Sequence, residues 1–222
     1  MGDLTEALLT DLIDEFEKRG LIMPLNKKQS KPHRIALLGI LTAIILIQNF
    51  VPFLGNIPIP PLNPTIIHIT VIVATLTMST TDGIIIGTIW GLTRMLRAYT
   101  MPATPLDLWL WVHPMISLVP RMFIGLFTGW TYNLLNKLAP KKEKVALITS
   151  SVVGSFTNTI LVLFFIYIFF GEPYAQAIDV DISNLGVALL VIVGTNGVAE
   201  AIAAGIIAPL VTVPLRKITY RK

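Results

Sequence analysis

The 222-residue chain is 54% hydrophobic and only 14% charged, and its mean hydropathy is +0.73. This composition excludes an ordinary soluble domain and is typical of a protein that folds in lipid. The chain has no cysteine, which excludes disulfides, thiolate nucleophiles and cysteine-based metal sites. Its net charge of +4 comes from basic residues that flank apolar runs, so we expect no nucleic-acid partner.

Residues 3–19 are predicted to form an amphipathic helix, because apolar side chains recur at four-residue spacing from Leu4 to Phe16. The segment is acidic, so anionic lipids should not attract it. We interpret residues 1–33 as a cytosolic extension that ends in a basic linker, and residues 34–222 as one membrane domain.

Apolar runs then predict six transmembrane helices. They cover residues 35–54, 65–78, 83–98, 114–135, 145–170 and 185–215. The second run is short, which indicates tilt or an irregular end. We expect an ordered proline-rich loop at 52–64, a tight turn at 79–83 and a loop that begins at Glu172. The predicted fold class is therefore an all-α integral membrane protein.

Basic residues gather in three places, at 27–34, at 137–144 and at 216–222. An even number of spans puts all three on one side of the membrane, and the positive-inside rule makes that side cytoplasmic. Both termini are therefore predicted to lie inside. The opposite loops carry acidic residues, namely Asp107, Glu172, Asp179 and Asp181.

Ionisable and amide side chains inside hydrocarbon are costly, so those in the predicted spans are candidate site residues. They are Gln48, Asn49, His68, Arg94, Arg97, Arg121, Asn158, Asn196 and Glu200. A helical rise of ~1.5 Å per residue puts the arginines in the outer half and Asn158 and Asn196 near the middle. The excess of arginine predicts an electropositive site that favours a carboxylate.

Each candidate could also have a purely structural role. For Arg97, snorkelling to the interface is the simpler one. The other two arginines could equally form structural pairs with a carboxylate, Glu200 or Asp107. The asparagines could join helices by hydrogen bonds, and a lone histidine such as His68 is more often a packing residue than a ligand.

Gly39 and Ala43 form a small-residue pair on the first predicted span. Such a pair lets another helix approach closely. That helix could belong to this chain or to a partner.

Four short segments carry a resemblance to a known family. They are Asn-Pro-Thr-Ile-Ile-His-Ile at 63–69, Val-Pro-Arg at 119–121, Gly-Ser-Phe-Thr-Asn-Thr at 154–159 and Asn-Gly-Val-Ala-Glu-Ala at 196–201. Together, in this order on six predicted spans, they resemble the substrate-binding S components of energy-coupling factor (ECF) vitamin transporters. Within that family the set is most similar to the pantothenate-specific members.

The resemblance implies a multi-pass protein of the bacterial cell membrane that captures a vitamin from outside. It also implies partners, which are a transmembrane coupling subunit and two cytosolic ATPase subunits. ATP would be used by those partners, and no cofactor is expected in this chain. The first-helix pair Gly39 and Ala43 would then contact the coupling subunit.

The candidate substrate-binding residues combine the two lines of reasoning. Arg121 or Arg94 would hold a carboxylate, amides would bond hydroxyl or amide groups, and the loop from Trp109 to His113 would close the mouth. The full set is Arg121, Arg94, Asn158, Asn196, His68, Asn63, Trp109 and His113.

Other functions remain open. Another vitamin, such as pyridoxine, hydroxymethylpyrimidine or riboflavin, could be the ligand. An intramembrane enzyme with Glu200 and His68 as acid and base is disfavoured, because their estimated depths differ and no nucleophile or metal site joins them. A stand-alone secondary transporter would normally show an internal repeat, which we do not find. The chain has no P-loop, so energy must come from a partner or an ion gradient.

Overall fold

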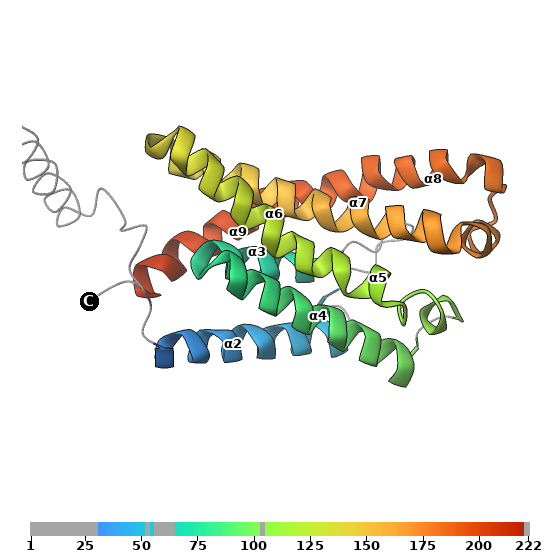
Figure 1. The fold of residues 1–222 in the computed structure, drawn as a ribbon, viewed down its shortest axis with the longest axis horizontal. Helices are drawn as coiled ribbons and strands as arrows, with labels where there is room; N and C mark the ends of the chain where they lie inside the picture. The colour runs from blue at the N-terminus through green and yellow to red at the C-terminus, as the bar shows by residue number, and fades with distance from the viewer. Residues whose placement is uncertain (1–30, 52–53, 56–64, 103–104, 220–222) are drawn as a thin grey trace, which may run out of the picture.

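The computed structural model describes residues 31–51, 54–55, 65–102 and 105–219, and every regular element in these residues is a helix. The chain runs back and forth along one axis, and the described chain begins and ends at the same end of the bundle (Figure 1). The long elements are α2 (Lys31–Phe50), α3 (Ile67–Thr77), α4 (Thr80–Thr100), α6 (Val119–Leu138), α7 (Glu143–Ala177) and α9 (Val198–Thr219). The short ones are η1 (Pro105–Leu108), α5 (Pro114–Ser117), η2 (Pro140–Lys142), η3 (Ile182–Asn184), α8 (Leu185–Ile192) and η4 (Val193–Gly197).

Helix α3 lies inside the bundle, where α2, α4, α6, α7 and α9 all contact it. Every residue of α3 is buried. A helix that is apolar on all sides is expected to be buried on all sides. The main apolar core forms around α3 and includes Ile72, Ile86 and Ile124, which are fully buried.

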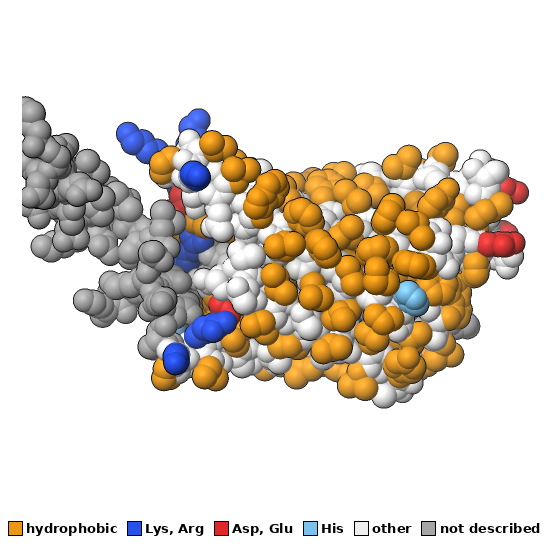
Figure 2. Space-filling model, in the orientation of Figure 1, with side chains coloured by type: hydrophobic (Ala, Val, Ile, Leu, Met, Phe, Trp, Pro, Cys, Tyr) orange, Lys and Arg blue, Asp and Glu red, His pale blue; other side chains and the backbone are white. Residues whose placement is uncertain are grey.

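Within the described residues, three helical stretches are long and apolar enough to cross a membrane: Lys31–Phe50, Pro140–Ala177 and Ile182–Thr219. Helix α3 is a shorter apolar helix. Large apolar side chains cover the outside of the bundle between its two ends (Figure 2), among them Leu190 and Leu210. So large an apolar surface is unfavourable in water and suits contact with lipid tails.

The expected tight turn at 79–83 is wrong. Helix α4 already begins at Thr80, and the Ser79 side chain accepts a hydrogen bond from the backbone N–H of Asp82. Serine is a favoured N-cap, and here it shortens the connection between α3 and α4 to two residues. The expected loop from Glu172 is wrong too, because α7 continues through Glu172 and Pro173 to Ala177.

Two irregular points divide the later helices. The chain breaks at Leu118 between α5 and α6, and Pro120 then stands in the first turn of α6. Between α8 and α9, the five residues of η4 form a π-helical turn.

Helix α2 begins at Lys31, so the predicted domain boundary at residue 33 falls inside this helix. The predicted helix at 3–19 lies outside the described residues.

Glycine lets α4 and α6 approach closely. A Cβ atom on Gly87 would lie 2.1 Å from the carbonyl oxygen of Arg121, and one on Gly125 would lie 2.5 Å from the backbone nitrogen of Ile84. Real Cβ atoms do not come so near, so both positions need glycine. This close approach sets the position of Arg121 relative to α4.

Basic side chains gather at the end of the bundle where α2 begins and α9 ends, and acidic ones appear at the opposite end (Figure 2). Two ion pairs tie helices together at the basic end. Arg34 on α2 bonds Asp82 on α4 at 2.7–2.8 Å. Arg216 on α9 bonds Glu143 on α7 at 2.8 Å.

Candidate functional site

Arg121 is the most deeply buried arginine of the predicted site, with 4% of its surface exposed. It lies in the first turn of α6, and its Nη1 donates a hydrogen bond to the backbone carbonyl of Ile116 in α5. Its Nε has no hydrogen-bond partner in the described part of the chain. Among the described residues, no carboxylate lies within ion-pair distance of this guanidinium.

Two tryptophans surround the Arg121 guanidinium. Its Cζ lies 4.9 Å from the ring centroid of Trp90 on α4 and 5.3 Å from that of Trp111, in the loop before α5. Indole faces attract cations at such distances. The two rings therefore replace part of the solvation that Arg121 loses by burial.

Arg94 lies one turn beyond Trp90 on α4, and it has a carboxylate partner. Its Nη2 bonds Oδ1 of Asp107 in η1 at 2.9 Å, and both side chains are largely buried. Its Cζ also lies 4.8 Å from the centroid of Trp111. Arg94 thus belongs to an ion pair that reaches the same indole as Arg121.

A second polar cluster forms around Glu200, which is 8% exposed on α9. Its Oε1 accepts a hydrogen bond from the backbone N–H of Thr65 at 2.8 Å, and its Oε2 accepts one from the hydroxyl of Thr159 on α7 at 3.1 Å. The charges of Glu200 and Arg121 act on each other, although the two groups form no ion pair.

His68 joins this second cluster from α3. It is fully buried, and its Nε2 lies 3.1 Å from the hydroxyl of Ser155 on α7. The ring also lies beside the backbone of Glu200 and of Thr65. The expected separation in depth between His68 and Glu200 is thus wrong, because the depth estimate assumes regular helices and ignores how the segment before α3 meets α9.

A serine, a histidine and a glutamate so close together invite comparison with a hydrolytic triad. In such a triad the carboxylate bonds Nδ1 of the histidine and orients it. Here Nδ1 of His68 has no hydrogen-bond partner among the described residues, and the Glu200 carboxylate bonds Thr65 and Thr159 instead. The hydrogen bond between carboxylate and histidine that orients such a triad is therefore not present in the described part of the chain.

The two predicted asparagines differ in setting. Asn158 on α7 is buried, and its Oδ1 has no hydrogen-bond partner. Asn196 is half-buried in the π turn η4, where the Thr195 hydroxyl lies 3.5 Å from its Oδ1. Asn158 thus presents an unused acceptor inside the bundle, next in sequence to Thr159 of the second cluster.

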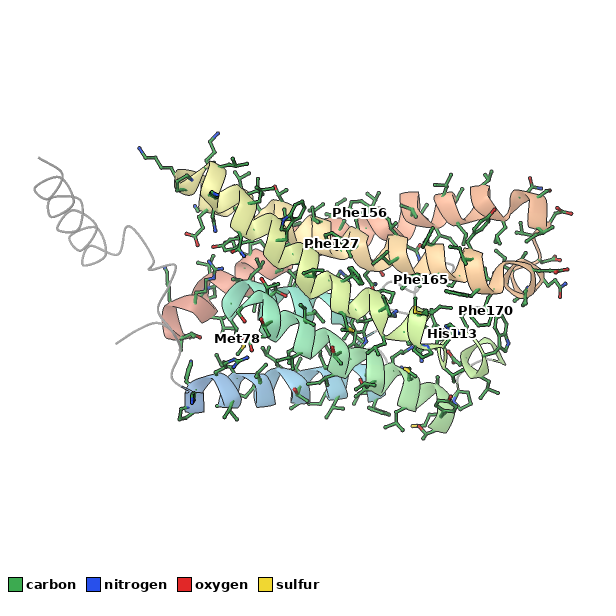
Figure 3. The ribbon with its side chains drawn as sticks, viewed as in Figure 1. Met78, His113, Phe127, Phe156, Phe165 and Phe170 are labelled. Carbon is green, nitrogen blue, oxygen red and sulfur yellow. The ribbon has the colours of Figure 1, made fainter. Side chains whose placement is uncertain are left out.

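The predicted mouth residues lie in an aromatic cluster at the end of the bundle opposite the termini. His113 packs against Phe169 and Phe170, with ring centroids 5.2 and 5.4 Å apart, and Trp109 lies 5.5 Å from Phe170. His113 and Phe170 can be followed in Figure 3. The cluster forms where α7 is kinked at Phe170, three residues before Pro173.

The remaining predicted residues lie elsewhere. Gly39 and Ala43 are exposed on the outer face of α2, and a Cβ atom on Gly39 would meet nothing within 4 Å. No helix of the described chain covers this pair. Asn63 lies outside the described residues.

Sequence reasoning misses Trp90 as a part of the site. It includes Trp111 only as a member of the loop from Trp109 to His113 that would close the mouth. Trp90 and Arg94 are four residues apart on one helix, so they share a face. That spacing is a usable signal, whereas the contact between Trp111 and the arginines is not visible in the sequence.

Among the described residues, no group of three or more metal-ligating side chains is found.

Comparisons with known proteins identify the family. The model of the family "ECF transporter, substrate-specific component" matches residues 33–212. The pantothenic acid transporter PanT of Lactococcus lactis is 28% identical over 204 residues, which cover 86% of this chain and 97% of that protein. The PanT of Leuconostoc mesenteroides is 35% identical over 95 residues, 41% of this chain and 46% of that protein.

A solved structure of ThiT from Listeria monocytogenes has the same fold. It superposes with a TM-score of 0.56 and 16% sequence identity, and the match covers 83% of this chain and 93% of ThiT. The predicted resemblance to ECF S components is confirmed, and so is a multi-pass location in the bacterial membrane. This chain belongs to the substrate-specific components of ECF transporters.

Proposed function

We propose that this chain binds pantothenate on the outer side of the membrane and delivers it to an ATP-driven ECF module. Two relatives named as pantothenate transporters support this substrate, one of them along nearly its whole length. The observation that carries the proposal is the buried Arg121 guanidinium, which has no carboxylate partner among the described residues.

A carboxylate ligand would satisfy Arg121. Burying a charge without a partner is costly, and a ligand carboxylate restores the interaction through charge-assisted hydrogen bonds. The unpartnered Nε of Arg121 is one donor for it. Arg94 is already paired with Asp107, so we assign the carboxylate to Arg121 and give Arg94 a supporting role.

Pantothenate also carries hydroxyl groups and an amide. The unpartnered Oδ1 of Asn158 can accept a hydrogen bond from a hydroxyl or an amide N–H. Asn196 could do the same from the π turn of the last helix, since π turns are frequent at functional sites. Pyridoxine and hydroxymethylpyrimidine lack a carboxylate and would leave Arg121 unpaired.

The proposed orientation has six transmembrane spans with both termini in the cytoplasm. The basic side chains at the end where α2 begins and α9 ends support it through the positive-inside rule. In this orientation η1, α5 and the aromatic cluster around His113 face outside. Asp107, Trp111 and Arg121 then lie toward the side from which the vitamin arrives.

The energy would come from partners, a transmembrane coupling subunit and two ATPases that use ATP. The exposed pair Gly39 and Ala43 on α2 supports a contact with the coupling subunit. Small residues allow two helices to pack closely in a membrane, and no described helix of this chain uses them.

Equilibrium binding of labelled pantothenate to the purified chain tests the substrate. Saturable binding that unlabelled pantothenate displaces, and that pyridoxine, riboflavin and hydroxymethylpyrimidine do not, is the expected result. Displacement by one of those vitamins at a lower concentration than pantothenate would contradict the proposed substrate.

A further inference from the structure

Trp111 is the one indole in the described chain that lies near two guanidinium groups. The Cζ atoms of Arg94 and Arg121 are 4.8 and 5.3 Å from its ring centroid. We propose that Trp111 is a positioning residue for the carboxylate site, because it fixes the Arg121 guanidinium and connects it to the Arg94–Asp107 pair. The inference rests on the proposed function, in which Arg121 holds the ligand carboxylate.

The charges around Trp111 are unevenly paired. Asp107 neutralises Arg94 at 2.9 Å, and Arg94 and Arg121 repel each other. The charge of Glu200 also acts on Arg121, but no carboxylate of the described residues lies within ion-pair distance of this guanidinium. A ligand anion that approaches this group meets one unpaired cation and one neutral ion pair, with the indole between them.

The backbone of Trp111 is held by a hydrogen bond. The hydroxyl of Ser117, which is fully buried in α5, donates to the carbonyl of Trp111 at 2.5 Å. The neighbouring carbonyl of Ile116 accepts the hydrogen bond from Arg121. The four-residue helix α5 therefore positions the backbone of Trp111 and the guanidinium of Arg121 relative to each other.

Trp90 limits Arg121 from the other helix. It is 2% exposed, and α4 carries it to within 4.9 Å of the guanidinium. With Trp90 and Trp111 both in place, Arg121 is restricted to a small range of orientations. A preorganised guanidinium keeps its donors directed at a carboxylate and loses little entropy on binding.

This arrangement predicts how strongly the site prefers pantothenate to a neutral analogue, and not only how tightly it binds pantothenate. A fixed Arg121 distinguishes pantothenate from its neutral primary amide, because the amide cannot form the charge-assisted bonds. If Trp111 is replaced by leucine, Arg121 can turn away or take up water. Affinity for pantothenate should then fall more than affinity for the amide.

The test measures the dissociation constants of pantothenate and of its primary amide for four purified chains. These are the unaltered chain, Trp111→Leu, Trp111→Phe and the control Trp130→Leu. Trp130 is 60% exposed on the outer surface of α6, so its replacement removes a tryptophan without touching Arg121. We compare the chains by the dissociation constant of the amide divided by that of pantothenate. We expect Trp111→Leu to lower this ratio about tenfold, in line with loss of a desolvated cation–π contact.

The phenylalanine variant separates positioning from packing. It keeps an aromatic face for both guanidinium groups, so most of the discrimination should return. If Trp111→Leu lost affinity for pantothenate and the amide equally, or lost neither, the ratio would stay unchanged. That result would overturn the role of Trp111. If the unaltered chain binds no pantothenate, the proposed function fails, and the inference fails with it.

Discussion

The carboxylate of Glu200 on α9 accepts a hydrogen bond at 2.8 Å from the backbone N–H of Thr65, a residue 135 positions earlier in the chain. Thr65 precedes α3, and its neighbour Ile66 donates to the carbonyl of Gly55 at 2.9 Å. The start of the central helix is therefore tied both to Gly55, which follows α2 in the chain, and to the last helix.

Replacing Glu200 should test whether this bond stabilises the fold. Glu200→Ala leaves the N–H of Thr65 and the hydroxyl of Thr159 without an acceptor, which should cost about 1–3 kcal/mol. Glu200→Gln retains an acceptor oxygen and should stay closer to the unaltered chain. The unfolding temperature in detergent measures both variants. If Glu200→Gln were as unstable as Glu200→Ala, the negative charge would be essential and the hydrogen bond alone would not account for the effect.

The carboxylate assignment predicts a specific loss for Arg121. Arg121→Gln should weaken pantothenate binding by about 2–5 kcal/mol, the range seen when one partner of a buried charge pair is removed. Binding of the neutral primary amide of pantothenate should change much less. Isothermal titration with both ligands measures the difference.

Arg97→Gln is the control for that experiment, because Arg97 lies near the end of α4 and is only half-buried. It should leave both affinities nearly unchanged. Similar losses for the acid and the amide in Arg121→Gln would contradict the pairing of this arginine with a carboxylate.

The three candidate membrane spans of the described residues can be predicted from the sequence, because a long apolar run with few charges is rarely found outside a membrane span. The ends of helices cannot. Ser79 suggests a turn, yet it caps α4, and both roles use the same preference of serine for local backbone bonds. The extension of α7 past Pro173 is equally hidden, because whether a proline ends a helix or kinks it depends on the packing around it.

Some features of the candidate site can likewise be predicted from the sequence, and others cannot. Arg94 and Arg121 stand out in the sequence because a charge inside a membrane span is rare. The sequence offers Asp107 or Glu200 as a partner for either arginine, and the pair of Arg94 with Asp107 is one of those alternatives; the choice between them depends on the path of a loop that one sequence does not reveal. The bond between Glu200 and Thr65 joins residues 135 positions apart, so no local pattern can indicate it.

The close approach of α4 and α6 predicts a strong effect of one methyl group. In Gly87→Ala the new Cβ would lie 2.1 Å from the carbonyl oxygen of Arg121, so the helices must separate. Overpacking of this kind typically costs about 1–3 kcal/mol. Because the shift moves Arg121 away from Trp90, pantothenate affinity should fall as well. Thermal unfolding and ligand binding in the same detergent measure both effects.

Gly186→Ala is the matched control for Gly87→Ala. Gly186 is also helical, in α8, but a Cβ atom there would meet nothing within 4 Å. Alanine favours the helix over glycine, so this variant should be as stable as the unaltered chain or slightly more so. Equal stability of the two alanine variants would show that the α4–α6 contact tolerates a side chain at position 87.

The exposed face of α2 predicts a separation between ligand binding and partner binding. Gly39→Leu places a large side chain where the described chain has open space, so the fold and the affinity for pantothenate should be preserved. A coupling subunit that packs closely against Gly39 and Ala43 would instead be held away. The expected result is normal pantothenate binding by the isolated variant, with a marked loss of co-purification with the coupling subunit and its ATPases. Gly186→Leu gives a control with the same change in an equally open position on another helix, and it should co-purify normally. If Gly39→Leu also co-purified normally, α2 would have to meet its partner through another face, or the partner would have to contact a different helix.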